Sequence, residues 1–242
     1  MTRILLLGGT LDARRLAAAL TEGALDAVYS IAGRTEASIP VPLPLRIGGF
    51  GGATGLADFI RTENISHVVD ATHPFAARIS ANAVAACAAT GTPLIALERA
   101  AWDGTGCIHV PDIKGAVAAL PDRPTRVFLA IGRQNLDAFA GLPHHWVLRL
   151  IDPAPQPLAG AEVIVSRGPF TTEDDTALMQ SRNIQIVVAK NAGGSGARAK
   201  LDAARVLGIP VILIARPYIP PRRTLHRVRD VMDWLHATPR GV

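Results

Sequence analysis

Glycine-rich turns stand out among the residues whose types and spacing could do chemistry. Gly8-Gly9-Thr10 follows the apolar stretch ILLL and precedes a predicted helix. Glycines let backbone N–H groups approach a phosphate closely, and the helix N-terminus favours an anion. We expect Thr10 to cap that helix and to donate its hydroxyl. The pattern predicts a pyrophosphate-binding turn, with an ordinary tight turn as the alternative because the full GxGxxG spacing is absent.

A cation follows the next predicted strand. Gly33, Arg34 and Thr35 stand where a dinucleotide-binding fold places the acidic residue that binds the ribose 2′-hydroxyl. A cation at this position favours a 2′-phosphate, so the sequence predicts NADPH in preference to NADH. Thr35 and Ser38 are further candidate donors to that phosphate. A surface arginine after a strand is the alternative.

The loop DATHPFA, residues 70–76, follows a third apolar strand. Because Pro74 is tolerated only in the first turn of a helix, Thr72 or His73 is expected to cap the helix that follows. We expect Thr72, His73 and Pro74 to contact the cofactor, since their loop faces the same side as Gly9. His73 is the candidate catalytic residue, able to donate a hydrogen bond or a proton. Positioning is the role that we favour for it, and a solvated loop histidine is the alternative.

The loop KNAGGSGARAK lacks the GxxxxGK[ST] spacing of a P-loop. Glycines with flanking cations at a helix start are nevertheless typical of an anion site. Two of the three lysines in the chain lie in this loop, which favours function over a flexible loop with solvated lysines. The residues that we expect to bind an anionic substrate, in this loop and after neighbouring strands, are Arg167, Lys190, Asn191, Gly193, Gly194, Ser195, Lys200 and Arg216.

These loops belong to two copies of one pattern. FIRTENISHVVDA, residues 59–71, and LMQSRNIQIVVAK, residues 178–190, share a helix end, an Asn-Ile pair and a strand with Val-Val. Each copy continues with a polar loop, an Ala-rich helix, a Gly-x-Pro turn and another apolar strand. Such a repeat indicates two related units. Alternating strands and helices predict the α/β class, as two tandem Rossmann-like parallel-sheet units whose loops face a shared cleft.

The expected boundary between the units is residues 121–124, because two prolines within four residues interrupt a helix. Residues 1–120 would form the NADPH-binding unit and residues 125–242 the substrate-binding unit. Each unit would close with a short strand and a helix, in CIHVPDIKGAVAAL and in TLHRVRDVMDWL.

The composition narrows the function classes. The chain has 242 residues, 49% of them hydrophobic, and a formal charge of +5 carried by 22 Arg and 3 Lys. The guanidinium of arginine binds carboxylates and phosphates through paired hydrogen bonds, so the arginine content favours an anionic substrate. General solvation of the surface is an equal alternative explanation of this content. The arginines are scattered without interleaved aromatics, which argues against nucleic acid. Two cysteines without CxxC spacing, seven histidines without metal spacing and no long apolar span predict a cytoplasmic protein without metal or membrane.

The ordered set of motifs resembles the precorrin-6A reductase family of cobalamin biosynthesis. The matching stretches are LLLGGTLDARRLA, IAGR, IGGFGGATGL, VVDATHPFAARIS, LERAAW, FLAIGRQNL, SRGPF, KNAGGSGARAKLDAA and LGIPVILIARP. The resemblance implies two Rossmann-like units and an oxidoreductase acting on a CH–CH group, with hydride transfer from NADPH to a macrocycle double bond of precorrin-6A that gives precorrin-6B. It also implies a substrate with several carboxylates, which gives the arginine-rich composition a reason.

Other functions stay open. A cobalt-precorrin-6A reductase of the anaerobic route and a non-catalytic NADPH-binding redox sensor are alternatives, although the sensor leaves KNAGGSGARAK without a role. A short-chain reductase needs Tyr and Lys four residues apart. Gly33 and Arg222 stand at that spacing after Tyr29 and Tyr218, so the sequence argues against this class.

Overall fold

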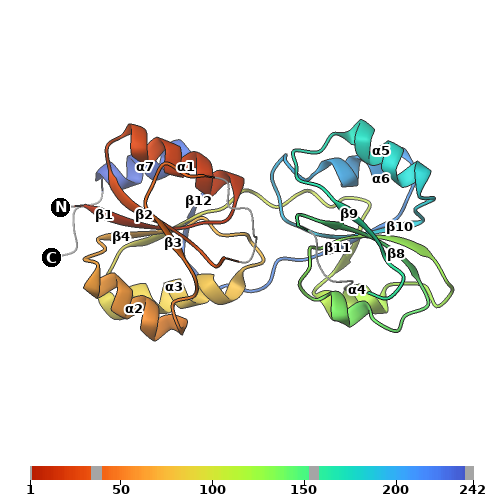
Figure 1. The fold of residues 1–242 in the computed structure, drawn as a ribbon, viewed down its shortest axis with the longest axis horizontal. Helices are drawn as coiled ribbons and strands as arrows, with labels where there is room; N and C mark the ends of the chain where they lie inside the picture. Colours follow the sequence, from red (N-terminus) through yellow and green to blue (C-terminus); the bar gives the residue numbers. More distant parts are fainter. Residues whose placement is uncertain (1, 34–39, 153–157, 238–242) are drawn as a thin grey trace. The chain divides into compact units, whose positions relative to one another are not determined.

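The computed structural model describes residues 2–33, 40–152 and 158–237. The chain forms two compact units, one of Met1–Arg99 with Tyr218–Val242 and one of Ala100–Pro217 (Figure 1). Within these residues, each unit contains a six-stranded sheet in which all neighbouring strands are parallel. This confirms the predicted α/β class with two Rossmann-like units.

The first unit has the strand order β12-β5-β4-β1-β2-β3. Its strands are β1 (Arg3–Leu7), β2 (Asp26–Ile31), β3 (Leu45–Ile47), β4 (His67–Asp70), β5 (Leu94–Leu97) and β12 (Arg223–Leu225). Helices cover both faces: α1 (Leu11–Glu22) and α7 (Val228–Ala237) on one, α2 (Gly52–Thr62) and α3 (Ala77–Thr90) on the other (Figure 1). Double coverage explains why the strands read as continuous apolar runs.

The second unit has the strand order β6-β11-β10-β7-β8-β9. Its strands are β6 (Ile108–Val110), β7 (Arg126–Ala130), β8 (His145–Leu150), β9 (Glu162–Val165), β10 (Ile186–Lys190) and β11 (Val211–Ile214). Helices α5 (Thr172–Ser181) and α6 (Ala199–Val206) pack side by side on one face, and α4 (Ile113–Ala118) with the 3-10 helix η1 (Leu136–Phe139) lies on the other (Figure 1).

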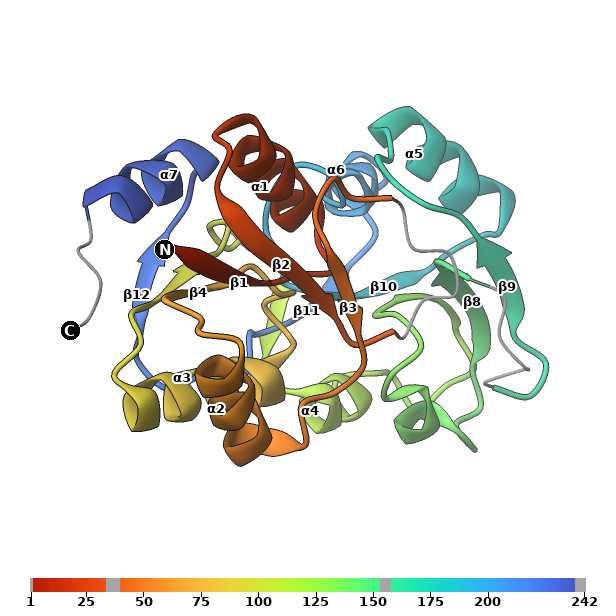
Figure 2. The ribbon, with the colours of Figure 1, turned by 60° about the vertical axis from the view of Figure 1, so that its left-hand side comes forward.

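The strand at one edge of each sheet does not come from the segment that the sequence indicated. The chain leaves the first unit after β5 and supplies β6 to the second sheet, where β6 pairs with β11. It then returns after β11 to add β12 beside β5, and β12 leads into α7 at the edge of the first unit (Figure 2). The division expected at residues 121–124 therefore lies inside the second unit. The physical reason is that β6 and β12 are both three-residue strands followed by a helix, so their local sequence does not show which sheet each joins.

Strand β1 shows how the core positions the site. Ile4 and Leu6 pack into the cluster formed with α1 and α7, whereas Leu5 and Leu7 pack with α2 and α3. All four side chains are buried. The loop that follows at Gly8 is thereby held at the carboxyl end of a strand with both faces covered. No helix among the described residues is long and apolar enough to span a membrane.

Candidate functional site

The turn after β1 is shaped by Tyr29 on the neighbouring strand. The Gly8 N–H donates to the Ser30 carbonyl at 2.8 Å, and the Gly9 N–H donates to the Tyr29 hydroxyl at 2.9 Å. A Cβ at Gly8 would lie 2.2 Å from Cζ of Tyr29, so only glycine fits beside this ring. Burial is the main cause that raises the pKa of Tyr29, which keeps its hydroxyl neutral and able to accept from the Gly9 N–H.

Among the described residues, Gly9 leaves open space at the N-terminus of α1. Its φ is +108°, a conformation that favours glycine, and a Cβ built there meets no described atom within 4 Å. Asp12 in the first turn of α1 would repel an anion, but Arg99 donates to its carboxylate at 3.2 Å. An uncovered glycine before a helix N-terminus, with the nearby carboxylate neutralised, fits the pyrophosphate of a dinucleotide.

Thr10 caps α1 as the sequence predicted. Its Oγ1 accepts from the Ala13 N–H at 3.0 Å and donates to the Ala71 carbonyl at 2.8 Å. The hydroxyl hydrogen that was expected to be available for a ligand is therefore used within the protein. Its bond ties the loop after β4 to the turn after β1.

Asp70 and Thr72 organise the DATHPFA loop. Oδ1 of Asp70 accepts from the Thr72 N–H at 3.1 Å and from the Thr72 hydroxyl at 2.7 Å. The expected capping of the next helix by Thr72 or His73 is wrong. Helix α3 begins at Ala77 without a side-chain cap, because the His73 carbonyl accepts from the Ala76 N–H at 2.7 Å and closes a separate turn first.

His73 is half-buried, and its Nδ1 accepts from the Phe75 N–H at 3.2 Å. An accepting Nδ1 places the hydrogen of the neutral imidazole on Nε2, where the ring can donate a hydrogen bond. Pro74 is buried in the same turn. The structure thus brings Thr72, His73 and Pro74 into one loop joined to the Gly8–Thr10 turn through Ala71.

The predicted 2′-phosphate site lies mainly outside the described residues. Arg34, Thr35 and Ser38 belong to the part of the chain that the structure does not describe. Gly33 directly precedes them with a φ of +71°, and a Cβ there would lie 2.7 Å from Cγ2 of Ile47. Gly33 is therefore required by close contact with β3.

In the second unit, the loop between β10 and α6 is built around Trp102. Asn191 accepts from the Trp102 N–H at 2.8 Å and donates to the Trp102 carbonyl at 3.1 Å. The indole N–H of Trp102 donates to the Gly194 carbonyl at 2.5 Å. A Cβ at Gly193 would lie 2.2 Å from the Ala100 carbonyl oxygen, so this loop also needs glycine for close packing.

Two of the predicted substrate-binding cations brace this loop. Lys200 is only 6% exposed, donates to the Ala197 carbonyl and places its ammonium 5.1 Å from the centroid of the Trp102 ring. Arg216 donates to the carbonyls of Asn191 and Ala192 at 3.0 and 3.2 Å. Both cations are engaged with the backbone or ring of their own unit.

The other predicted residues of this unit differ in exposure. Arg167 is exposed and pairs with Asp152. Ser195 is exposed at the tip of the loop, and Lys190 is half-buried at the end of β10. Burial lowers the pKa of Lys190, because the charged ammonium is poorly solvated there.

Comparisons with known proteins match the whole chain. A family model described as precorrin-6x reductase CbiJ/CobK matches residues 3–236. The precorrin-6A reductase of Rhodobacter capsulatus is 57% identical, with 100% of both chains covered. That of Rhodococcus erythropolis is 47% identical over 99% of this chain and 100% of its own. The chain belongs to the precorrin-6x reductase family.

A solved structure supports this membership. The structure titled CobK precorrin-6A reductase is 57% identical, covers 100% of both chains and superposes with a TM-score of 0.92. A more distant relative, the cobalt-precorrin-6A reductase of Priestia megaterium, is 31% identical over 89% of this chain and 91% of its own. As a precorrin-6x reductase, the protein is an oxidoreductase of cobalamin biosynthesis that uses a nicotinamide cofactor.

Several residues that shape the sites of this precorrin-6x reductase are not among those predicted from the sequence. Tyr29 and Trp102 hold the two glycine loops, and Arg222 pairs with Asp70 and Glu98. Trp102 and Glu98 follow the strand at residues 94–97, so their position after a strand was the available signal. Nothing in the sequence indicated that Arg222 returns to the first unit.

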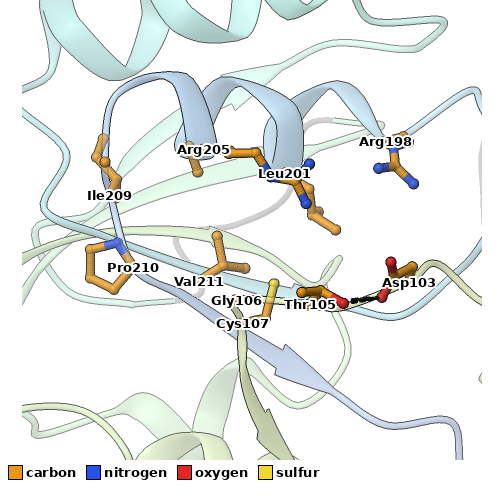
Figure 3. Close-up of a pocket in the computed structure, with 12 residues that line it drawn as sticks. Asp103, Thr105, Gly106, Cys107, Arg198, Leu201, Arg205, Ile209, Pro210 and Val211 are labelled. Atoms are coloured by element: carbon orange, nitrogen blue, oxygen red, sulfur yellow. Dashed lines mark hydrogen bonds between the residues drawn. The ribbon is translucent and has the colours of Figure 1, made fainter.

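A pocket of about 270 Å³ in the second unit is separate from these residues. It lies between α6 and the segment 103–107, with Arg198 and Arg205 on the helix side and Cys107 opposite (Figure 3). None of the predicted site residues that the structure describes lines it. Burial raises the pKa of Cys107, so the thiol is a poor nucleophile.

Proposed function

We propose that the protein reduces a double bond of precorrin-6A with NADPH, giving precorrin-6B. The observation that carries this proposal is the space that the described residues leave open at Gly9, at the carboxyl end of β1 and the N-terminus of α1. In a parallel sheet this is where a dinucleotide binds. Family membership over residues 3–236 supports the reaction class.

The first unit would hold the cofactor. Gly8, Gly9 and Thr10 would form the pyrophosphate turn, with Tyr29 keeping its backbone in place through the Gly9 N–H. Thr72, His73 and Pro74 would lie against the cofactor from the next loop. When bound, the nicotinamide supplies the hydride. The role that we assign to His73 is positioning, through the hydrogen that Nε2 carries while Nδ1 accepts from Phe75.

Arg34 would select NADPH, with Thr35 as a second donor to the 2′-phosphate. Arg34→Ala is expected to weaken NADPH binding by about 1.5–3 kcal/mol, the range for a hydrogen bond to a charged group. NADH affinity should change little because NADH lacks this phosphate. Fluorescence titration with both cofactors checks the expectation, and equal losses for both would remove Arg34 from the 2′-phosphate site.

The second unit would hold the carboxylates of the macrocycle. The expected residues fall into two groups by their contacts. Lys200, Arg216, Asn191, Gly193 and Gly194 would shape the loop, because they bond to Trp102 or to loop carbonyls, or pack closely beside Ala100. The residues that would face the substrate directly are Arg167, Lys190 and Ser195. Cations placed around carboxylates orient the substrate for hydride transfer.

We propose a cobalt-free substrate over a cobalt-containing one. Five relatives named precorrin-6A reductase are 44–57% identical, whereas three named cobalt-precorrin-6A reductase are 29–31% identical. We also place the reaction in the cytoplasm, since Cys87 and Cys107 are free thiols, as expected in a reducing compartment.

A spectroscopic assay tests the proposed function. Purified protein is mixed anaerobically with precorrin-6A and NADPH, and the absorbances of the macrocycle and of the nicotinamide are followed together. We expect both to change with one NADPH consumed for each macrocycle reduced. NADH and cobalt-precorrin-6A serve as the matched controls. NADPH binding without any change in the macrocycle would favour the redox sensor instead.

A further inference from the structure

Arg222 makes two ion pairs within the first unit. Its Nη2 donates to Oε2 of Glu98 at 2.8 Å, and its Nε lies 3.5 Å from Oδ2 of Asp70. The Arg222 side chain is 10% exposed and that of Asp70 is 1% exposed. Charges this deeply buried are stable only when paired, so the carboxylate of Asp70 depends on this guanidinium.

Arg222 and Asp70 reach each other across the sheet. Arg222 directly precedes β12 and Asp70 ends β4, while β5 lies between these two strands. Among the described residues, neither Nε of Arg222 nor Oδ2 of Asp70 has a hydrogen-bond partner. Their mutual attraction is therefore the interaction that neutralises this side of the Asp70 carboxylate.

The other oxygen of Asp70 orders the cofactor loop. Oδ1 accepts both the Thr72 N–H and the Thr72 hydroxyl, and Ala71 beside it is tied to Thr10. An ionised carboxylate makes stronger hydrogen bonds than a neutral one. A single chain of contacts thus runs from Arg222 through Asp70 to Thr72.

We propose that Arg222 is a positioning residue for cofactor binding, which orders the Thr72–Pro74 loop through the buried carboxylate of Asp70. The inference rests on the proposed function, because it takes that loop as part of the NADPH site. It also means that the cofactor loop is completed by a residue that follows the whole second unit in the sequence. The structural alternative is that Arg222 only fastens β12 to the sheet.

The test combines hydrogen exchange with cofactor titration in the full-length protein. Arg222→Met removes both ion pairs while keeping the aliphatic part of the side chain. Without cofactor, we expect the amide of Thr72 to exchange at least about 10-fold faster, with little change elsewhere in the first unit. The Kd for NADPH should rise on the order of 10- to 100-fold, the effect of a small displacement of positioning groups. Arg223→Met, at the exposed neighbouring position, should change neither value.

A conservative variant separates positioning from folding. Arg222→Lys keeps the positive charge but loses the planar guanidinium that can donate to two carboxylates. We therefore expect its Thr72 amide exchange and its NADPH affinity to lie between those of wild type and Arg222→Met. If Arg222→Met raises hydrogen exchange throughout the first unit, the Arg222→Lys variant distinguishes a positioning role from a purely structural one. Loosening confined to residues 70–76 supports positioning, and uniform loosening shows that the role is only structural.

A double variant at Arg222 and Thr72 gives an independent test, because it measures whether the two residues affect NADPH affinity through the same contacts. Thr72→Val removes the hydroxyl that donates to Asp70. If Arg222 acts through this loop, the losses of NADPH affinity in Thr72→Val and Arg222→Lys should not add in the double variant. Additive losses, or faster exchange with unchanged NADPH affinity, overturn the inference. Failure of wild-type protein to bind NADPH would instead overturn the proposed function, and exchange in the cofactor-free protein still reports whether Arg222 orders the loop.

Discussion

The glycines in the turn after β1 and in the loop after β10 are required for different physical reasons. Gly8 is needed because the ring of Tyr29 leaves no room for a Cβ, and Gly193 because the Ala100 carbonyl lies beside it. Gly9 is needed for its backbone conformation, and no atom of the described residues lies near the place of its missing Cβ. The sequence predicted both glycine turns. It did not predict their partners, because Tyr29 and Ala100 are distant along the chain.

Valine substitutions should separate the roles of Gly8 and Gly9. Gly9→Val is expected to cost about 1–3 kcal/mol of the free energy of unfolding, from backbone strain, and to abolish NADPH binding. Gly8→Val should cost more, because its side chain also overlaps Tyr29. Urea unfolding followed by circular dichroism, together with NADPH titration, checks both. Normal NADPH affinity in Gly9→Val would place the pyrophosphate elsewhere.

Lys190 should make stability depend on pH. Burial lowers its pKa in the folded protein, whereas the unfolded chain has the ordinary value of about 10.4. Between these values the unfolded state binds more protons. The cost of this lysine to stability is therefore full below the folded-state pKa and disappears as pH rises through that window. Lys190→Met should therefore be more stable than wild type at pH 7, with an advantage that shrinks toward about pH 10.4.

The control for Lys190 is Lys114, which is exposed. Lys114→Met makes the same chemical change at a solvated position. Urea unfolding at several pH values between 7 and 10 measures both variants. An advantage of Lys190→Met that grows with pH would contradict the expected direction.

At the scale of elements, the hydrophobic pattern located strands better than helix starts. The apolar runs of the sequence predict strands over residues 3–7 and 145–150, and the structure has strands with these bounds. The sequence also predicts a short strand over residues 41–47. The structure limits it to Leu45–Ile47, since Pro42 and Pro44 cannot donate to a ladder. The sequence predicts a helix that begins at Leu56. Helix α2 begins instead at Gly52, and the low helix propensity of the glycines in its first turn explains the difference.

The repeated Asn-Ile pair has a structural cause. Asn64 and Asn183 have φ values of 52° and 48°, and the following isoleucines, Ile65 and Ile184, each donate at 2.9 Å to a carbonyl of the preceding helix. Asparagine tolerates this left-handed conformation, which ends the helix and turns the chain into the strand. The sequence therefore predicted the helix end correctly without the conformation being known.

Substitutions at Asn183 test this cause. Asn183→Ala should lower the free energy of unfolding by about 1–2 kcal/mol, the cost of a left-handed conformation for an ordinary residue. Asn183→Gly should be close to neutral, because glycine adopts this conformation readily. Equilibrium unfolding in urea measures both. Equal losses for alanine and glycine would show that the asparagine side chain matters instead of the backbone.

At the scale of the whole molecule, the repeat predicted two units but not which segments complete them. The short strands β6 and β12 follow the same pattern, and each lies at an edge of its sheet. Their pairing is decided by contacts distant in sequence: α7 places Val231, Trp234 and Leu235 in the core formed with α1. Such contacts leave no local signal, so the boundary at residues 121–124 was the natural but incorrect choice.

Two fragments of the same length test where the boundary lies. Fragment 100–217 contains every strand of the second sheet, from β6 to β11. It should fold alone, with a cooperative thermal transition followed by circular dichroism. Fragment 125–242 lacks β6 and Trp102 and carries β12 and α7 without the sheet that they complete. It should unfold at lower temperature or fail to fold, because the apolar face of α7 then has no partner.

The complementary truncation tests the first unit. Removal of residues 218–242 deletes three buried residues of its core, Val231, Trp234 and Leu235, and exposes the edge of β5. Because the loss of each large core side chain costs on the order of 2–5 kcal/mol, the first unit should not stay folded. NADPH binding should then be lost, while the thermal transition of the second unit is retained. A truncated protein that still binds NADPH would show that β12 and α7 are dispensable for the cofactor unit.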